Sequence, residues 1–134
     1  MSTMSLTVAG VVLITVPTIV FGGVSLLTFL MRDVPGYRDN PVRRSLWRAG
    51  HAHAGVLVLF ALVAMLYVDQ TSLPEGVRTL TRVLIVAAPI LMPLGFFLSV
   101  ARPGDTRPNK LIWLTVAGGA GLAVGTLTLG VGLL

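Results

Sequence analysis

The two histidines of the sequence, His51 and His53, lie at the start of a long apolar segment, and their side chains are candidates for chemistry. An imidazole can ligate a haem iron or a divalent metal, carry a proton, or hydrogen-bond an amphiphilic ligand. Residues two positions apart on a helix are rotated by about 200° and point to nearly opposite faces. One regular helix therefore cannot place both rings on one iron or one metal. An irregular helix start near Gly50 and Gly55 would lift that restriction.

Three interpretations of the pair stay open. In the first, one ring bonds a carbonyl or a water at the membrane surface, and the other faces the headgroups. In the second, one ring faces the interior and ligates haem b or a divalent metal, so that His51 and His53 are candidate cofactor and metal ligands. In the third, a histidine carries protons or binds a quinone or a lipid.

Acid–base chemistry inside the membrane has little support in this sequence. No Asp or Glu lies within the apolar segments to orient a histidine or to relay protons. The chain has no Cys, which excludes disulfides, thiolate nucleophiles and Cys metal sites. The absence of carboxylates from the apolar segments weighs against a buried acid–base enzyme and against ion-coupled transport.

The composition is that of a membrane protein. Hydrophobic residues make up 54% of the chain and charged residues 11%, whereas soluble domains carry about 25% charged residues. The charges fall in three short segments that separate four apolar runs, and about 20 apolar residues cross a bilayer core about 30 Å thick. We expect an all-α, four-transmembrane-helix bundle in one membrane domain over residues 1–134. The expected helices are about 6–31, 49–68, 80–101 and 111–134.

The basic residues predict how the chain lies in the membrane. Eight of the ten occur in the first and third connecting segments or just after them, and two occur at Arg78 and Arg82. This pattern predicts cytoplasmic first and third loops, with both termini on the non-cytoplasmic side. It also explains the net charge of +5 without nucleic acid. The dominance of Arg, Gly, Ala and Val is typical of a GC-rich bacterial genome, so we expect a bacterial inner membrane.

Aromatic and basic side chains flank the apolar runs, where they are expected to anchor helices at the membrane surfaces. The expected anchors are Trp47, Arg48, Arg82 and Trp113. Arg82 could also pair with Asp69 or Glu75.

Small residues at a spacing of four predict close contacts between helices. The candidates are Gly50, Ala54, Ala117, Gly121 and Gly125. The stripe on the last helix is expected to be buried against a partner, which predicts a homo-oligomer or a larger membrane complex within the lipid bilayer.

Three prolines interrupt the apolar runs. Pro17 lies in the first run, and Pro89 and Pro93 lie one turn apart in the third, so these two share a helix face. Proline removes a backbone hydrogen bond and kinks a helix. A kink is expected at all three, and Pro89 with Pro93 could line a polar cavity.

Residues 44–53, RSLWRAGHAH, resemble the R-A-H-x-N stretch that opens the second helix of MAPEG proteins, which are four-helix membrane enzymes and relatives that use glutathione. The helix count, the basic first loop and the orientation are similar too. The sequence departs from that pattern with an inserted Gly50, with His53 in place of Asn, and with Val56 in place of Glu. The glutathione chemistry is therefore not carried over.

The G-H-x-H pattern also resembles the His-bearing helices of haem-copper-oxidase-like proteins, and the whole chain resembles small bacterial four-helix integral membrane proteins. We expect a small polytopic membrane protein that binds haem, a metal, or a lipid-like or quinone molecule near His51 and His53 at the cytoplasmic mouth. One alternative is a structural or accessory subunit without a site of its own. Another is an oligomeric channel or transporter for small molecules.

Overall fold

The computed structural model describes all 134 residues and contains four long helices and no strand. The helices are α1 (Thr3–Met31), α2 (Pro41–Tyr67), α3 (Glu75–Leu98) and α4 (Trp113–Leu133). Two short 3-10 helices, η1 (Val68–Gln70) and η2 (Lys110–Ile112), complete the secondary structure. Each of the four long helices is long and apolar enough to cross a membrane. The prediction of an all-α fold with four such helices is confirmed.

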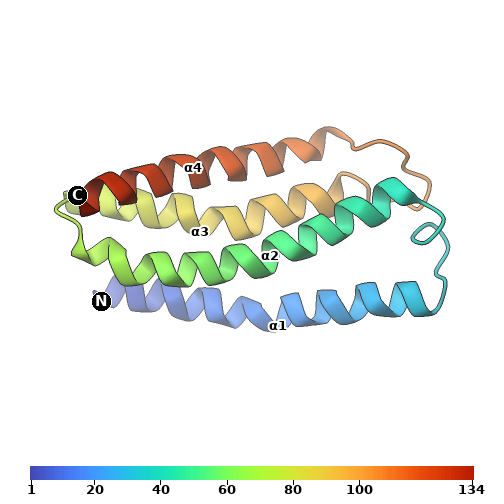
Figure 1. Ribbon diagram of the computed structural model, residues 1–134, viewed down its shortest axis with the longest axis horizontal. Coiled ribbons are helices and arrows are strands. Elements are labelled where there is room, and N and C mark those ends of the chain that lie inside the picture. Colours follow the sequence, from blue (N-terminus) through green and yellow to red (C-terminus); the bar gives the residue numbers. More distant parts are fainter.

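The helices lie antiparallel and side by side in chain order, so that α2 and α3 form the middle of the molecule (Figure 1). Both termini lie at one end, which we call the terminal end, together with residues 68–74. The opposite end, which we call the loop end, holds residues 32–40 and 99–112. The tightest apolar core lies toward the terminal end, where α2, α3 and α4 meet around Met65, Ile85 and Leu129.

Helix α2 begins eight residues before the predicted position. Asn40 forms its N-cap, where Oδ1 accepts a hydrogen bond of 3.0 Å from the backbone N–H of Arg43. Pro41 occupies the first helical position, where its missing N–H costs nothing. Residues 43–48, which the prediction placed in a connecting segment, are therefore part of α2. Apolarity marks only the lipid-spanning part of a helix, whereas the cap marks its start.

The bounds of α3 also differ from the predicted 80–101. This helix begins at Glu75, directly after Pro74, and ends at Leu98. Its first turn is polar, so the apolar run did not include it.

Helix α4 packs on α3 through glycines. A Cβ atom at Gly118 would lie 2.8 Å from Cγ of Met92, and one at Gly125 would lie 2.9 Å from Cγ1 of Ile85. Gly121 only touches Leu84, and the predicted Ala117 is exposed. The close contact therefore runs along positions seven residues apart, Gly118 and Gly125, and is made within the chain.

Helix α2 approaches α3 through the predicted small residues at its loop-end half. A Cβ atom at Gly50 would lie 3.0 Å from Cβ of Phe96 and 3.1 Å from the ring of Phe97. Ala54 is buried one turn further along. An alanine at Gly50 would therefore require Phe96 and Phe97 to shift by a few tenths of an ångström.

The two connections at the loop end are tied to each other. The side-chain amide of Asn40 donates to the carbonyls of Pro103 and Asp105, at 3.1 and 2.8 Å. Arg43 donates to the carbonyls of Gly36 and Ala101, at 3.0 and 2.9 Å. These bonds hold the α1–α2 and α3–α4 connections together as one polar cap.

Trp47 packs inside this end of the protein. Its indole N–H donates to the carbonyl of Phe97 at 3.2 Å, and the guanidinium of Arg43 lies 4.0 Å from its ring centroid. By contrast, Arg48 and Trp113 are exposed, as surface anchors would be. Trp47 thus joins α2 to α3 and is covered on one face by Arg43.

Candidate functional site

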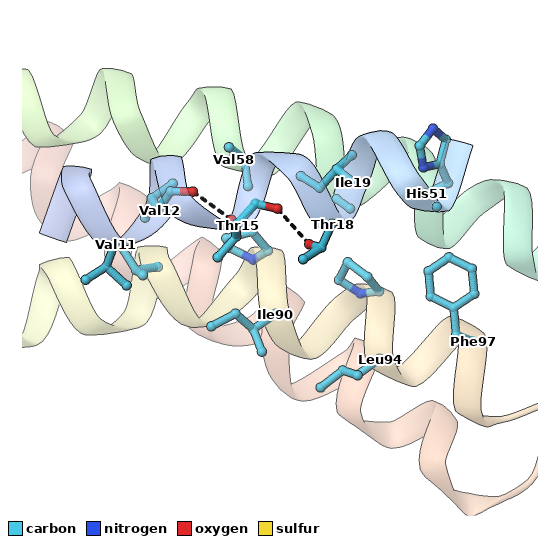
Figure 2. A pocket seen from close by; sticks show the side chains of 15 residues that line it. Val11, Val12, Thr15, Thr18, Ile19, His51, Val58, Ile90, Leu94 and Phe97 are labelled. Carbon is cyan, nitrogen blue, oxygen red and sulfur yellow. Dashed lines mark hydrogen bonds between the residues drawn. The ribbon is translucent and has the colours of Figure 1, made fainter. Parts of the chain in front are cut away.

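An apolar groove with a volume of about 310 Å³ lies between α1, α2 and α3. Val12 and Thr15 of α1, Val58 of α2, and Pro89 and Phe97 of α3 are among the residues that line it. Its volume is at the lower end of the range found for small-molecule sites, about 300–1,000 Å³. Figure 2 shows side chains from the three helices converging on it.

The groove exists because α1 is packed loosely against the rest of the bundle. Only Ser5 and Val12 of this helix are buried, although it is the longest helix of the chain. Both prolines of α3, Pro89 and Pro93, line the groove, whereas Pro17 of α1 is exposed and does not. The cavity expected at Pro89 and Pro93 is therefore present, but its walls are apolar rather than polar.

The two threonines of α1 that line the groove have no free hydroxyl proton to donate to a ligand. The hydroxyl of Thr15 donates to the carbonyl of Val12, and that of Thr18 donates to the carbonyl of Thr15, each at 2.6 Å (Figure 2). Their protons are used within α1, so they offer a ligand only acceptor lone pairs.

His51 is the one residue with an ionisable side chain among those that line the groove. Its half-buried ring lies between α1 and α2, at the same end of the groove as Phe97 (Figure 2). A Cβ atom at Gly23 would lie 3.1 Å from both Cε1 and Nε2 of this ring, and one at Gly22 would lie 3.6 Å from Nδ1. The Gly22-Gly23 pair therefore gives the imidazole its place beside α1.

Neither ring nitrogen of His51 has a hydrogen-bond partner within the protein. A neutral imidazole offers one donor and one acceptor. The groove thus combines apolar walls with a single group that can fix the polar part of a ligand.

His53 is held in a different way. Its Nδ1 lies 2.8 Å from the carbonyl oxygen of Ala49 on its own helix, and its ring centroid lies 5.1 Å from that of Phe96 on α3. Because a carbonyl only accepts, Nδ1 must carry the proton of this bond. His53 therefore fits the first interpretation, in which a histidine ring hydrogen-bonds a carbonyl.

The structure does not bring His51 and His53 together. Helix α2 is continuous through residues 41–67, so no irregular start turns the two rings to one side. No group of three or more His, Cys, Asp or Glu side chains could hold a metal ion. The two candidate ligands lie toward α1 and toward α3, and only His51 reaches the groove.

No protein-family model, curated protein or solved structure matches the chain. The site is therefore interpreted from its own residues.

A cluster of polar side chains around Arg82 lies at the terminal end, and its members bond to one another. Arg82, only 2% exposed, binds Asp69 at 2.5 Å and Glu75 at 2.9 Å, and its Nε donates to the hydroxyl of Ser5 at 3.0 Å. The amide and hydroxyl of Ser2 donate to the same Asp69 carboxylate. Arg82 pairs with both expected carboxylates, but it is buried among them instead of reaching out to headgroups.

Gly22, Gly23 and Thr15 are not among the candidate site residues that the sequence predicts. Their part in the site depends on which turn of α1 faces His51, and no pattern within one helix carries that information. The signal that was available is the pair of adjacent glycines, since glycine in a helix is costly unless something approaches closely.

Proposed function

We propose that this protein is a multi-pass membrane protein that binds an amphiphilic molecule, lipid-like or quinone, in the groove between α1, α2 and α3. The apolar body of the ligand lies along the groove, and its polar group meets His51. One observation carries the proposal: an imidazole without a protein hydrogen-bond partner lies at one end of an apolar cavity of about 310 Å³.

The proposed orientation suits this ligand. Loops rich in arginine lie at the loop end, which the positive-inside rule assigns to the cytoplasm of a bacterial inner membrane, and both termini then face outside. His51 lies ten residues, or about 15 Å, along α2 from Pro41. It is thus placed below the cytoplasmic surface, where the polar part of an amphiphile meets the hydrocarbon.

The donor set favours an amphiphile over a metal ion. Protein metal sites use three or more side-chain ligands, and the groove offers one. A quinone carbonyl or a lipid hydroxyl needs a single hydrogen bond, together with apolar contact along its length.

The proposal is tested by the molecules that copurify with the protein in a mild detergent. Organic extraction and mass spectrometry should find one class of amphiphile at close to one equivalent per chain. Thr18→Phe puts a large side chain into the groove at an exposed position, and we expect this variant to lose the amphiphile.

Thr7→Phe is the matched control. Thr7 lies on the same helix, is exposed, does not line the groove, and bonds its own helix as Thr18 does. Equal amphiphile content in both variants would contradict the proposal, and so would a Soret absorption band that disappears in His51→Ala, since that band would identify haem as the ligand.

A further inference from the structure

A second, polar pocket lies between α1 and α2 at the loop end, with a volume of about 580 Å³. Arg44, Ser45 and Arg48 of α2 line it, and Leu26 of α1 lies opposite. Arg44 and Arg48 are one helical turn apart, so both side chains leave α2 on one face. His51 lines this pocket as well as the groove and therefore lies between the two.

The pocket carries positive charge that no carboxylate of the chain neutralises. Four ion pairs exist in the protein, and they use Arg38, Arg78 and Arg82 but neither arginine of this pocket. Arg44 donates one bond of 3.0 Å to the carbonyl of Arg38, which holds its side chain in place, and Arg48 is exposed. Two guanidinium groups and a hydroxyl are thus presented together, with no Asp or Glu among the lining residues.

We propose that this pocket binds the phosphate group of an anionic lipid, at a site separate from the groove. Guanidinium groups bind phosphate oxygens in pairs of parallel hydrogen bonds. Arg44 and Arg48 clamp the phosphate, and the Ser45 hydroxyl donates a further bond.

The position of the pocket along α2 indicates a lipid rather than a free ion. Arg48 and Arg44 lie three and seven residues before His51, or about 4.5 and 10 Å further toward the loop end. At that level a helix leaves the hydrocarbon and enters the headgroup region, where lipid phosphates are found. Leu26 and Ala52 supply apolar surface beside the arginines for the first part of an acyl chain.

The test compares phosphatidylglycerol with phosphatidylcholine bound to the purified protein in mixed micelles that contain both lipids equally, as counted by native mass spectrometry. The unaltered protein should prefer phosphatidylglycerol by about thirtyfold, as expected from two surface arginines. Arg44→Gln/Arg48→Gln should bring the ratio close to one. Arg102→Gln/Arg107→Gln removes the same charge from exposed positions outside the pocket and should leave the preference in place.

Single variants separate binding from folding. The side chain of Arg48 makes no hydrogen bond or ion pair within the protein, so Arg48→Gln should keep the helical circular dichroism and still reduce the preference several-fold. An equal loss in both double variants would overturn the proposal, because it would reveal only general surface charge. Complete displacement of phosphatidylglycerol by millimolar inorganic phosphate would also overturn it, because the site would then take the free ion.

The proposal for the groove and the proposal for this pocket can be refuted independently of each other. Thr18→Phe should leave the phosphatidylglycerol preference unchanged, whereas Arg44→Gln/Arg48→Gln should leave the amphiphile of the groove in place. A common loss in both variants would contradict the separation of the two sites.

Discussion

Arg82 and His51 are both polar side chains between the helices of the bundle, and they differ in whether the protein satisfies their hydrogen bonds. Arg82 is 2% exposed and bonds two carboxylates and a serine hydroxyl. His51 is half-buried, has no protein partner for either ring nitrogen, and borders two cavities. A buried polar group with every bond made holds helices together, and one with its bonds unmade is free to bind a ligand.

The two regions also hold α1 in different ways. At the terminal end, Ser2 and Ser5 bind α1 to Asp69 and Arg82 by hydrogen bonds. Next to His51, α1 makes room for the ring at Gly22 and Gly23 and leaves the groove beside it. We therefore propose that the region around Arg82 stabilises the fold and that the region around His51 binds the ligand.

The largest effect is expected at Arg82. Arg82→Met leaves Asp69 without its buried partner, and breaking such a pair costs about 3 kcal/mol of unfolding free energy. Denaturation of the purified protein, followed by circular dichroism, measures the loss. The double variant Arg82→Met/Asp69→Leu should recover part of it, since apolar replacement of both partners removes the unpaired charge. An unchanged unfolding midpoint in Arg82→Met would contradict a stabilising role for Arg82.

The next effect separates the two histidines. His51→Leu should weaken binding of the copurifying amphiphile about tenfold, which is the value of one hydrogen bond, with stability changed by less than about 0.5 kcal/mol. His53→Leu should keep the affinity and lose about 1 kcal/mol of stability, because its bond to Ala49 is internal. The affinity for the amphiphile and the unfolding free energy, measured for both variants, distinguish the two roles. The opposite assignment, with affinity lost only in His53→Leu, would refute the role of His51.

The smallest effect is expected at Gly23. A methyl group there would lie 3.1 Å from Cε1 and Nε2 of His51, so Gly23→Ala pushes the ring by a few tenths of an ångström without removing it. The affinity should fall a few-fold, on the order of half the His51→Leu effect in free energy. Gly10→Ala is the control, since nothing lies within 4 Å of a Cβ atom at that position. Equal affinities in the two variants would show that the ring position does not matter.

The four helices could be predicted from the sequence because each contains an apolar run. The start of α2 could not be predicted from its apolar run, because the helix begins with Asn40 and Pro41, before the apolar residues. The pairing of Arg82 was also accessible, since Asp69 and Glu75 are the only carboxylates near it in the chain.

The site could be predicted only in part. The rule that residues two apart face opposite sides correctly separated His51 from His53. Which of them meets the groove depends on how α1 lies against α2, and the residues of α1 beside His51, Gly22 and Gly23, are distant from it in the sequence. The contact of α4 with α3 runs through Gly118 and Gly125 rather than through the predicted stripe of Ala117, Gly121 and Gly125. The sequence of α4 alone could not predict this, because the contact also depends on the side chains of α3.

Photochemical labelling inside a bilayer tests the central claim most directly. The protein is reconstituted with a fatty-acid probe that carries a diazirine at the end of its chain, irradiated and digested, and the labelled positions are found by mass spectrometry. We predict that labelling concentrates on α1 between Val11 and Gly22 and on α3 between Val86 and Phe97, and that Thr18→Phe abolishes this labelling while Thr7→Phe does not. Labelling spread evenly over the lipid-facing surfaces of all four helices, and equal in the two variants, would contradict a binding groove beside His51.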